Sequence, residues 1–177
     1  MSERYVAFLR AINVGGHRII KMADLKRAME DAGMEQVRTL LASGNVVFEH
    51  PSSDHAAVRK ELEELIAARF GFEVEVVLRT HAAIREMVAR DPFGDVALGK
   101  DITGYVTFLY DEPDAELAAA IEALSTEVET LRVHGSDVFT TYYRTRGKAE
   151  QVNGLEKKLK IVGTTRNWNT VVKLAGM

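Results

Sequence analysis

The feature that most constrains the fold is a pattern of strands and turns that occurs twice. Residues 38–48 (RTLLASGNVVF) and 129–139 (ETLRVHGSDVF) each show a strand, a glycine-containing turn and a second strand with Val-Phe. Two apolar runs on either side of a short turn of this kind are typical of a β-hairpin. Two similar hairpins in one chain indicate an internal duplication.

The first half predicts the order strand, helix, strand, strand, helix, strand. Residues 5–10 are a β-branched and aromatic run that suits a central strand, and apolar residues in 22–32 recur at helical spacing. The first hairpin follows, and then a helix over 58–70 behind the candidate capping residues Ser53 and Asp54. With a closing strand, this order is the ferredoxin-like split βαβ arrangement.

The second half repeats the pattern after a connecting helix. That helix ends before Pro92, because proline disfavours the α conformation in the residue before it. A strand over 105–110, a helix over 113–124 and the second hairpin follow, and two helices end the chain, over 152–159 and 168–174. No convincing fourth strand is predicted here.

We therefore predict an α+β fold of two ferredoxin-like (βαββαβ) halves packed together, with a connecting helix and a C-terminal helix. The predicted segments are residues 1–79, 80–102 and 103–177. The central strands, Tyr5–Leu9 and Tyr105–Tyr110, are apolar on both faces. A lone half leaves one sheet face open, so we expect that face to be covered by the other half or by an added helix.

Composition excludes several classes of site. The chain has no cysteine, which excludes disulfides, thiolate catalysis and cysteine-based zinc sites. No pair of histidines has the spacing that would bring two imidazoles together on a helix, so we predict no metal and no cofactor. No window resembles a membrane span or a signal peptide, and we expect a cytoplasmic protein without a membrane partner.

Charge is distributed unevenly along the chain. Residues 144–173 hold eight Lys or Arg against Glu150 and Glu156, so they carry +6, and the remainder of the chain carries −9 for a total of −3. A basic patch attracts negatively charged partners. The alternative is an ordinary solvated helix face.

The first candidate site lies between the first strand and the first helix. There Gly15 and Gly16 would let the backbone approach a phosphate, Arg10 and Lys21 would supply charge, and Asn13 would orient an oxygen. The spacing matches neither a Walker sequence nor a dinucleotide fingerprint. The alternative is a tight turn in a short hairpin.

The second set of candidates comprises a turn in the first half and a polar segment near the C-terminus. Ser43 and Asn45 suit a turn, which explains them adequately. Arg166, Asn167 and Asn169 place several directional hydrogen-bonding groups within one helical turn, more than a helix cap demands. In the structural alternative, Thr164 or Thr165 caps the last helix and the Trp168 indole N–H finds an acceptor.

Four motifs in this order resemble one family. They are RAINVGG at 10–16, Lys21-Met22, SGNVVF at 43–48 and TTRNWNTV at 164–171. The family is a widespread bacterial domain of unknown function, number sixteen-ninety-seven, and the chain departs from its usual pattern at Ala11, where glycine is common, and at Ala42, where glutamine is common. The resemblance implies the duplicated ferredoxin-like fold and no established activity.

The sequence leaves several functions open. We favour binding of a small anionic or phosphate-bearing ligand, with Gly15 and Arg166 as edges of a common hollow. The alternatives are nucleic-acid binding through the basic C-terminal third, with Tyr142 and Tyr143 as stacking candidates, or a small enzyme acting on a phosphorylated metabolite. A protein-interaction module is a further possibility. No nucleophile or general base can be named.

Overall fold

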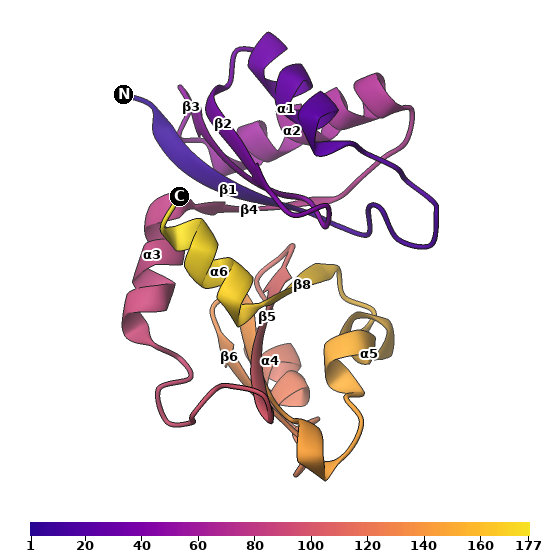
Figure 1. The fold of residues 1–177 in the computed structure, drawn as a ribbon, viewed down its shortest axis with the longest axis vertical. Helices are drawn as coiled ribbons and strands as arrows, with labels where there is room; N and C mark the ends of the chain where they lie inside the picture. Colours follow the sequence, from indigo (N-terminus) through magenta and orange to yellow (C-terminus); the bar gives the residue numbers. More distant parts are fainter. The chain divides into compact units, whose positions relative to one another are not determined.

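The computed structural model describes residues 1–177, which form two four-stranded antiparallel sheets flanked by helices (Figure 1). The chain divides into two compact units. Unit 1 comprises Met1–Glu86 and Leu174–Met177, and unit 2 comprises Met87–Lys173. The division into segments 1–79, 80–102 and 103–177 stays a prediction.

Unit 1 carries the first ferredoxin-like half. Its strands have the order β2-β3-β1-β4, and α1 and α2 pack on one face of the sheet. Alternate β1 residues Tyr5, Ala7 and Leu9 point into this helix-covered core and are fully buried. The elements of this part of the chain are β1 (Glu3–Leu9), α1 (Met22–Asp31), β2 (Glu35–Leu40), β3 (Asn45–His50), α2 (His55–Phe70), β4 (Val76–Thr80) and the connecting helix α3 (His81–Arg90).

The signals that predicted α2 act as expected. The Asp54 carboxylate accepts hydrogen bonds from the Ala56 and Ala57 backbone N–H groups, which satisfies donors that lack partners within the helix. At the other end Gly71 adopts the left-handed conformation, with φ of 82°. Local sequence therefore fixes both ends of this helix.

Unit 2 carries the second half. Its strands have the order β6-β7-β5-β8, and residues of α4 and α5 share one core cluster with Leu109, Leu131 and Val138. On the other face, Phe93 packs against Phe139 and Trp168, so the connecting loop and the C-terminal helix contribute cover there, as expected for an added helix. The elements are β5 (Ile102–Leu109), α4 (Ala115–Glu122), β6 (Glu129–His134), β7 (Asp137–Tyr143), the 3₁₀ turn η1 (Arg144–Arg146), α5 (Gln151–Leu159), β8 (Gly163–Asn167) and α6 (Trp168–Ala175).

The prediction that the second half lacks a fourth strand was wrong. Gly163–Asn167 forms β8, which pairs antiparallel with β5 from Tyr105–Asn167 to Leu109–Gly163. The segment GTTRN has no apolar alternation, and the usual strand signal is therefore missing. Backbone pairing with β5 forms the strand at the edge of the sheet.

The duplication extends to individual backbone hydrogen bonds. The Leu9 N–H donates to the Gly44 carbonyl at 2.8 Å, and the Leu109 N–H donates to the Ser136 carbonyl at 2.9 Å. One residue later, the Arg10 backbone N–H donates to the Glu75 carbonyl at 3.0 Å, and the Tyr110 backbone N–H donates to the Val162 carbonyl at 2.9 Å. Both units therefore share one sheet plan, which confirms the predicted fold class.

Candidate functional site

The first candidate segment, between β1 and α1, is a loop held together by Asn13. The Asn13 amide N–H₂ donates to the carbonyls of Ile20 at 2.9 Å and Ala42 at 2.7 Å, and its oxygen accepts from the Ile20 N–H at 2.8 Å. These bonds tie the loop to the turn between β2 and β3. The amide therefore has a structural role, which explains an asparagine at this position.

Gly15 and Gly16 form the tight turn of this loop. They have φ values of 60° and 76°, and an isolated bridge joins Val14 to His17 on either side. The nearby charges lie at the ends of the loop. Arg10 faces Glu75 at 3.4 Å, and Lys21 is exposed at the N-terminus of α1. The turn alternative is confirmed, and a ligand contact at these residues stays a prediction.

The turn between β2 and β3 meets the same loop. The buried Asn45 amide donates to the Leu40 carbonyl at 2.7 Å and to Ser43 Oγ at 3.1 Å. Gly44 lies so close to the loop that a Cβ there would be 2.7 Å from Ile12 Cδ1 and 2.8 Å from Leu9 Cβ. The structure thus brings two of the sequence motifs together, and it uses their amides for folding.

A polar cleft in unit 2 has different chemistry. Its volume is about 340 Å³, and it opens between the segment that precedes β5, the end of β7 and the start of α6. No Asp or Glu side chain lines it. The lining residues are Leu98, Gly99, Lys100, Ile102, Thr103, Gly104, Arg144, Asn167, Trp168 and Asn169.

Two cations border this cleft without a carboxylate partner. Arg144 Nε donates to Thr103 Oγ1 at 2.9 Å, and its guanidinium carbon lies 5.4 Å from the centre of the Tyr142 ring. These contacts orient the side chain and leave its two terminal NH₂ groups unbonded. Lys100 is exposed and makes no hydrogen bond or ion pair through its side chain. The cleft is therefore electropositive.

The amides of Asn167 and Asn169 add neutral polar groups. Asn167 Oδ1 accepts from the Asn169 backbone N–H at 2.9 Å, so Asn167 caps α6 instead of Thr164 or Thr165, which lie in β8. The Asn167 NH₂ group and the whole Asn169 side-chain amide remain unbonded at the cleft. Trp168 packs edge-on against Phe93, with ring centres 5.1 Å apart, and its indole N–H has no acceptor within the protein.

The wall formed by the loop before β5 is fixed to the sheet by Arg132. This β6 residue donates from Nη2 to the Pro92 carbonyl at 2.8 Å and forms an ion pair with Asp95 at 3.2 Å. The hydrogen bond and the charge of Arg132 lower the pKa of the Asp95 carboxyl. Arg132 therefore holds the first part of the loop that carries Lys100.

Arg166 is the remaining candidate. It is buried, and it does not line the cleft, although the next residue, Asn167, does. Its Nη1 donates to Thr164 Oγ1 at 2.5 Å and to the Thr165 carbonyl at 3.0 Å. Burial lowers its pKa to about 10, against the opposing effect of Glu156. Gly15 lies in unit 1 and Arg166 in unit 2, and their common hollow stays a prediction.

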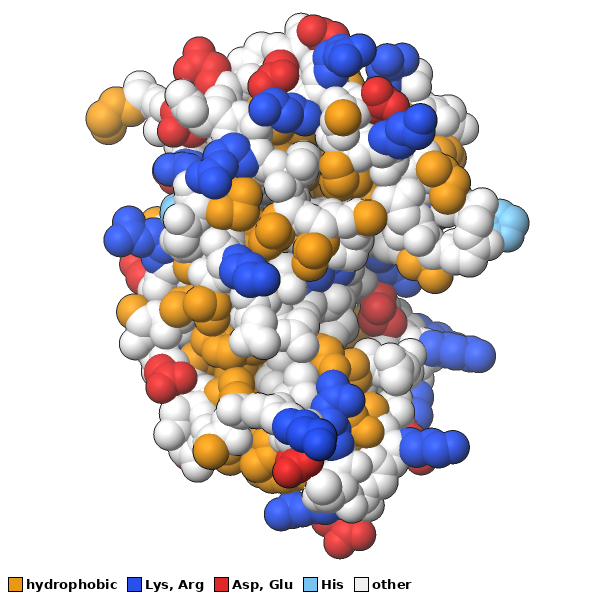
Figure 2. All heavy atoms as spheres, viewed as in Figure 1, with side chains coloured by type: hydrophobic (Ala, Val, Ile, Leu, Met, Phe, Trp, Pro, Cys, Tyr) orange, Lys and Arg blue, Asp and Glu red, His pale blue; other side chains and the backbone are white.

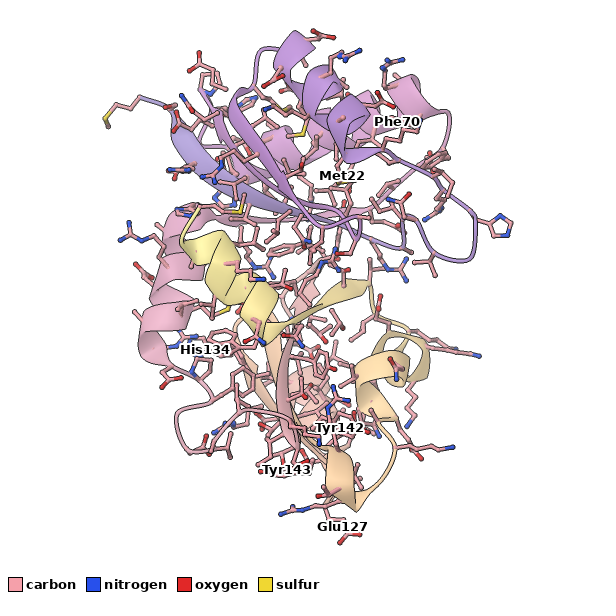
Figure 3. All side chains as sticks on the ribbon, viewed as in Figure 1. Met22, Phe70, Glu127, His134, Tyr142 and Tyr143 are labelled. Atoms are coloured by element: carbon pink, nitrogen blue, oxygen red, sulfur yellow. The ribbon has the colours of Figure 1, made fainter.

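The tyrosines considered for stacking lie at the end of β7, at the same end of unit 2 as Glu127 (Figure 3). As consecutive strand residues, Tyr142 and Tyr143 point to opposite faces of the sheet. An arginine also covers each ring, with Arg144 5.4 Å from Tyr142 and Arg146 4.0 Å from Tyr143. The two rings do not form a shared stacking platform.

Sequence reasoning found Asn167 and Asn169 but missed Lys100, Thr103 and Arg144 as cleft residues. The only signal was the predicted ferredoxin-like fold, in which the strand over 138–143 lies beside the strand over 105–110. Neighbouring antiparallel strands place the end of one beside the start of the other, and the Arg144 N–H does donate to the Asp101 carbonyl at 2.9 Å. The register between β5 and β7, which pairs Ile102 with Tyr143, brings Arg144 to Asp101, and the sequence analysis predicted no such register.

No group of three or more His, Asp or Glu side chains is arranged to hold a metal ion. None of the helices combines the length and the apolar character needed to cross a membrane.

Comparison with known proteins now identifies the family. The family described as "Protein of unknown function (DUF1697)" matches residues 2–139. The chain belongs to this family. A solved structure, that of conserved bacterial protein SP0830 from Streptococcus pneumoniae, is 24% identical and has a TM-score of 0.77, covering 99% of this chain and 98% of its own. At this identity the likeness shows the fold alone. No protein with curated function matches.

Proposed function

We propose that this DUF1697 protein binds a small anionic or phosphate-bearing ligand in the cleft of unit 2. The observation that carries the proposal is the absence of any carboxylate from a cleft that Lys100 and Arg144 border as unpaired cations. Unpaired cations at a surface cleft attract anions, and a guanidinium fork binds phosphate or carboxylate through two parallel hydrogen bonds. The volume of about 340 Å³ lies at the lower end of the range for small-molecule sites.

Titration of the purified protein with inorganic phosphate and with phosphorylated metabolites tests the proposal by calorimetry and thermal shift. A ligand that binds only the folded state raises the melting temperature. At a ligand concentration of a hundred times Kd, the free energy of unfolding rises by about 2.7 kcal/mol. We expect millimolar phosphate compounds to stabilise the wild type. No stabilisation by any anion of the panel would contradict the proposal.

Charge-removing variants locate the site. Lys100→Gln and Arg144→Gln should each weaken binding by about tenfold or more, since a charge-assisted hydrogen bond contributes more than a neutral one. Lys157→Gln is the matched control. It removes the same charge from an exposed residue of the same unit, outside the cleft, and should leave Kd unchanged. An equal loss in all three variants would indicate a general charge effect instead of a site.

Nucleic-acid binding is the second candidate, and the geometry favours it less. On the face that Figure 2 shows, basic side chains form small groups that are separated by acidic, hydrophobic and neutral side chains. The two tyrosines lie on opposite sheet faces, as described above. Titration with a single-stranded oligonucleotide at several salt concentrations tests this candidate, and binding that weakens steeply with salt would support it over the small-ligand site.

A further inference from the structure

The charged and polar side chains that line the cleft indicate which class of small anion it binds. Two cations face the same space, and a phosphomonoester carries between one and a half and two negative charges at neutral pH, about twice the charge of a carboxylate. The unbonded NH₂ groups of Arg144 offer a planar pair of donors, and Lys100 offers a point charge. This pair of charges matches a terminal phosphate group.

The remaining polar groups suit hydroxyl groups. The Asn169 side-chain amide is unbonded and offers donors and an acceptor, while Asn167 retains its NH₂ donors after its oxygen caps α6. Thr103 Oγ1 accepts from Arg144 and keeps its own proton free to donate. Sugar and polyol hydroxyls are both donors and acceptors, so they can satisfy all three side chains.

The aromatic side chains nearby are poorly placed to hold a nucleobase. Base recognition in single nucleotides and strands commonly uses stacking on an open aromatic face. Trp168, which lines the cleft, is only 8% exposed and packs against Phe93. The Tyr142 ring does not line the cleft, and the Arg144 guanidinium carbon lies over it, 5.4 Å from the ring centre.

We infer that the ligand class is a phosphomonoester of a small polyhydroxylated compound, such as a sugar or polyol phosphate, and not a nucleotide. Arg144 and Lys100 hold the phosphate, while Asn167, Asn169 and Thr103 bind the hydroxyl groups. The inference rests on the proposed function, since it names the ligand of the same cleft.

A matched panel tests the inference by calorimetry on the full chain. The panel comprises inorganic phosphate, hexose and pentose phosphates, the same sugars without phosphate, and nucleoside monophosphates. We expect sugar phosphates to bind at least tenfold more tightly than inorganic phosphate and than the nucleotides, with no binding of the free sugars. Asn169→Ala should remove most of the preference for sugar phosphate over inorganic phosphate.

The outcomes separate the two proposals. Equal affinity for inorganic phosphate and sugar phosphates, or tighter binding of nucleotides, would overturn the ligand class and leave anion binding intact. Binding of the free sugars as tight as that of their phosphates would overturn the phosphate assignment. Absence of binding by every compound would overturn the proposed function as well. If Asn169→Ala lowers the melting temperature, Asn169→Asp, which keeps the size and places a negative charge at the site, should still abolish phosphate binding.

Discussion

The buried carboxylate of Glu129 gives the most direct test of how unit 2 is held together. It is 1% exposed and accepts three backbone N–H groups at the N-terminus of α5, those of Glu150 at 2.7 Å, Gln151 at 2.8 Å and Val152 at 2.9 Å. No side chain of α5 or its flanking residue caps this end. A residue from β6 therefore supplies the cap that the helix lacks locally.

The expected cost of losing this cap follows from the bonds. Glu129→Gln keeps the shape, removes the charge that complements the helix dipole and turns one acceptor into a donor that faces an N–H group. Together these changes should cost about 2 kcal/mol. Glu129→Ala leaves all three donors without the carboxylate and should cost about 4 kcal/mol. For a chain of this size, each kcal/mol lowers Tm by about 2–4 °C.

Urea unfolding followed by tryptophan fluorescence measures this effect where it occurs, because the single tryptophan, Trp168, is buried in the same unit. The control is Glu127→Gln, an exposed glutamate two residues away whose loss should change the free energy of unfolding by less than about 0.5 kcal/mol. If Glu129→Gln unfolds within about 0.5 kcal/mol of the wild type, the carboxylate does not hold α5 in the way described.

Two further predictions concern unit 1. Gly44→Ala should destabilise the protein by about 3 kcal/mol, because alanine is strained at φ of 86° and its Cβ would lie 2.7 Å from Ile12 Cδ1. Gly16→Ala is the control, since Gly16 has a φ of 76° with open space around it, and this change should cost about 1 kcal/mol. Equal costs in urea unfolding would refute the effect of the close approach at Gly44. Burial lowers the pKa of His81 below its usual 6.5. As the pH falls through 6.5, the unfolded chain therefore binds a proton before the folded chain does, and stability should fall. His81→Gln, which can keep the hydrogen bond from the Nε2 position to the Leu174 carbonyl (3.0 Å), should reduce this pH dependence, and an unchanged pH profile in the variant would contradict the assignment.

The sequence predicted the fold well where apolar periodicity and local caps determine structure. The two hairpins, the helices and the Asp54 cap are examples, because each depends on residues close in the chain. It failed at β8, where Thr164, Thr165 and Arg166 follow no strand pattern and pairing with β5 imposes the conformation. Tertiary pairing overrides local preference at such edge strands.

The site was predicted less well, for a similar reason. Asn167 and Asn169 stood out as an unusual density of amides, whereas Lys100 and Arg144 are ordinary surface residues until strand register brings them to one end of the sheet. The Asn13 and Asn45 amides, by contrast, donate to backbone carbonyls and hold loops together, and a ligand contact at these residues stays a prediction. Composition cannot distinguish an amide that binds backbone from one that remains unbonded at a cleft.

Comparison of the two units indicates where the proposed recognition arises. Register pairs Tyr5 with Thr80 and Tyr105 with Asn167, so Thr80 and Asn167 are equivalent, and both cap the helix that follows. By the same registers, which pair Tyr5 with Phe48 and Tyr105 with Thr140, the position equivalent to Arg144 is Ser52 in unit 1.

The duplicated scaffold thus keeps the cap in both copies, while the cation at the end of the third strand occurs only in the second. Binding chemistry of this kind resides in the loops and strand ends, which can change without altering the sheet. A relative with the same fold but without cations at positions 100 and 144 would accordingly keep the architecture and lose affinity for the phosphate. Ligand recognition should therefore follow these two positions and not membership of the fold.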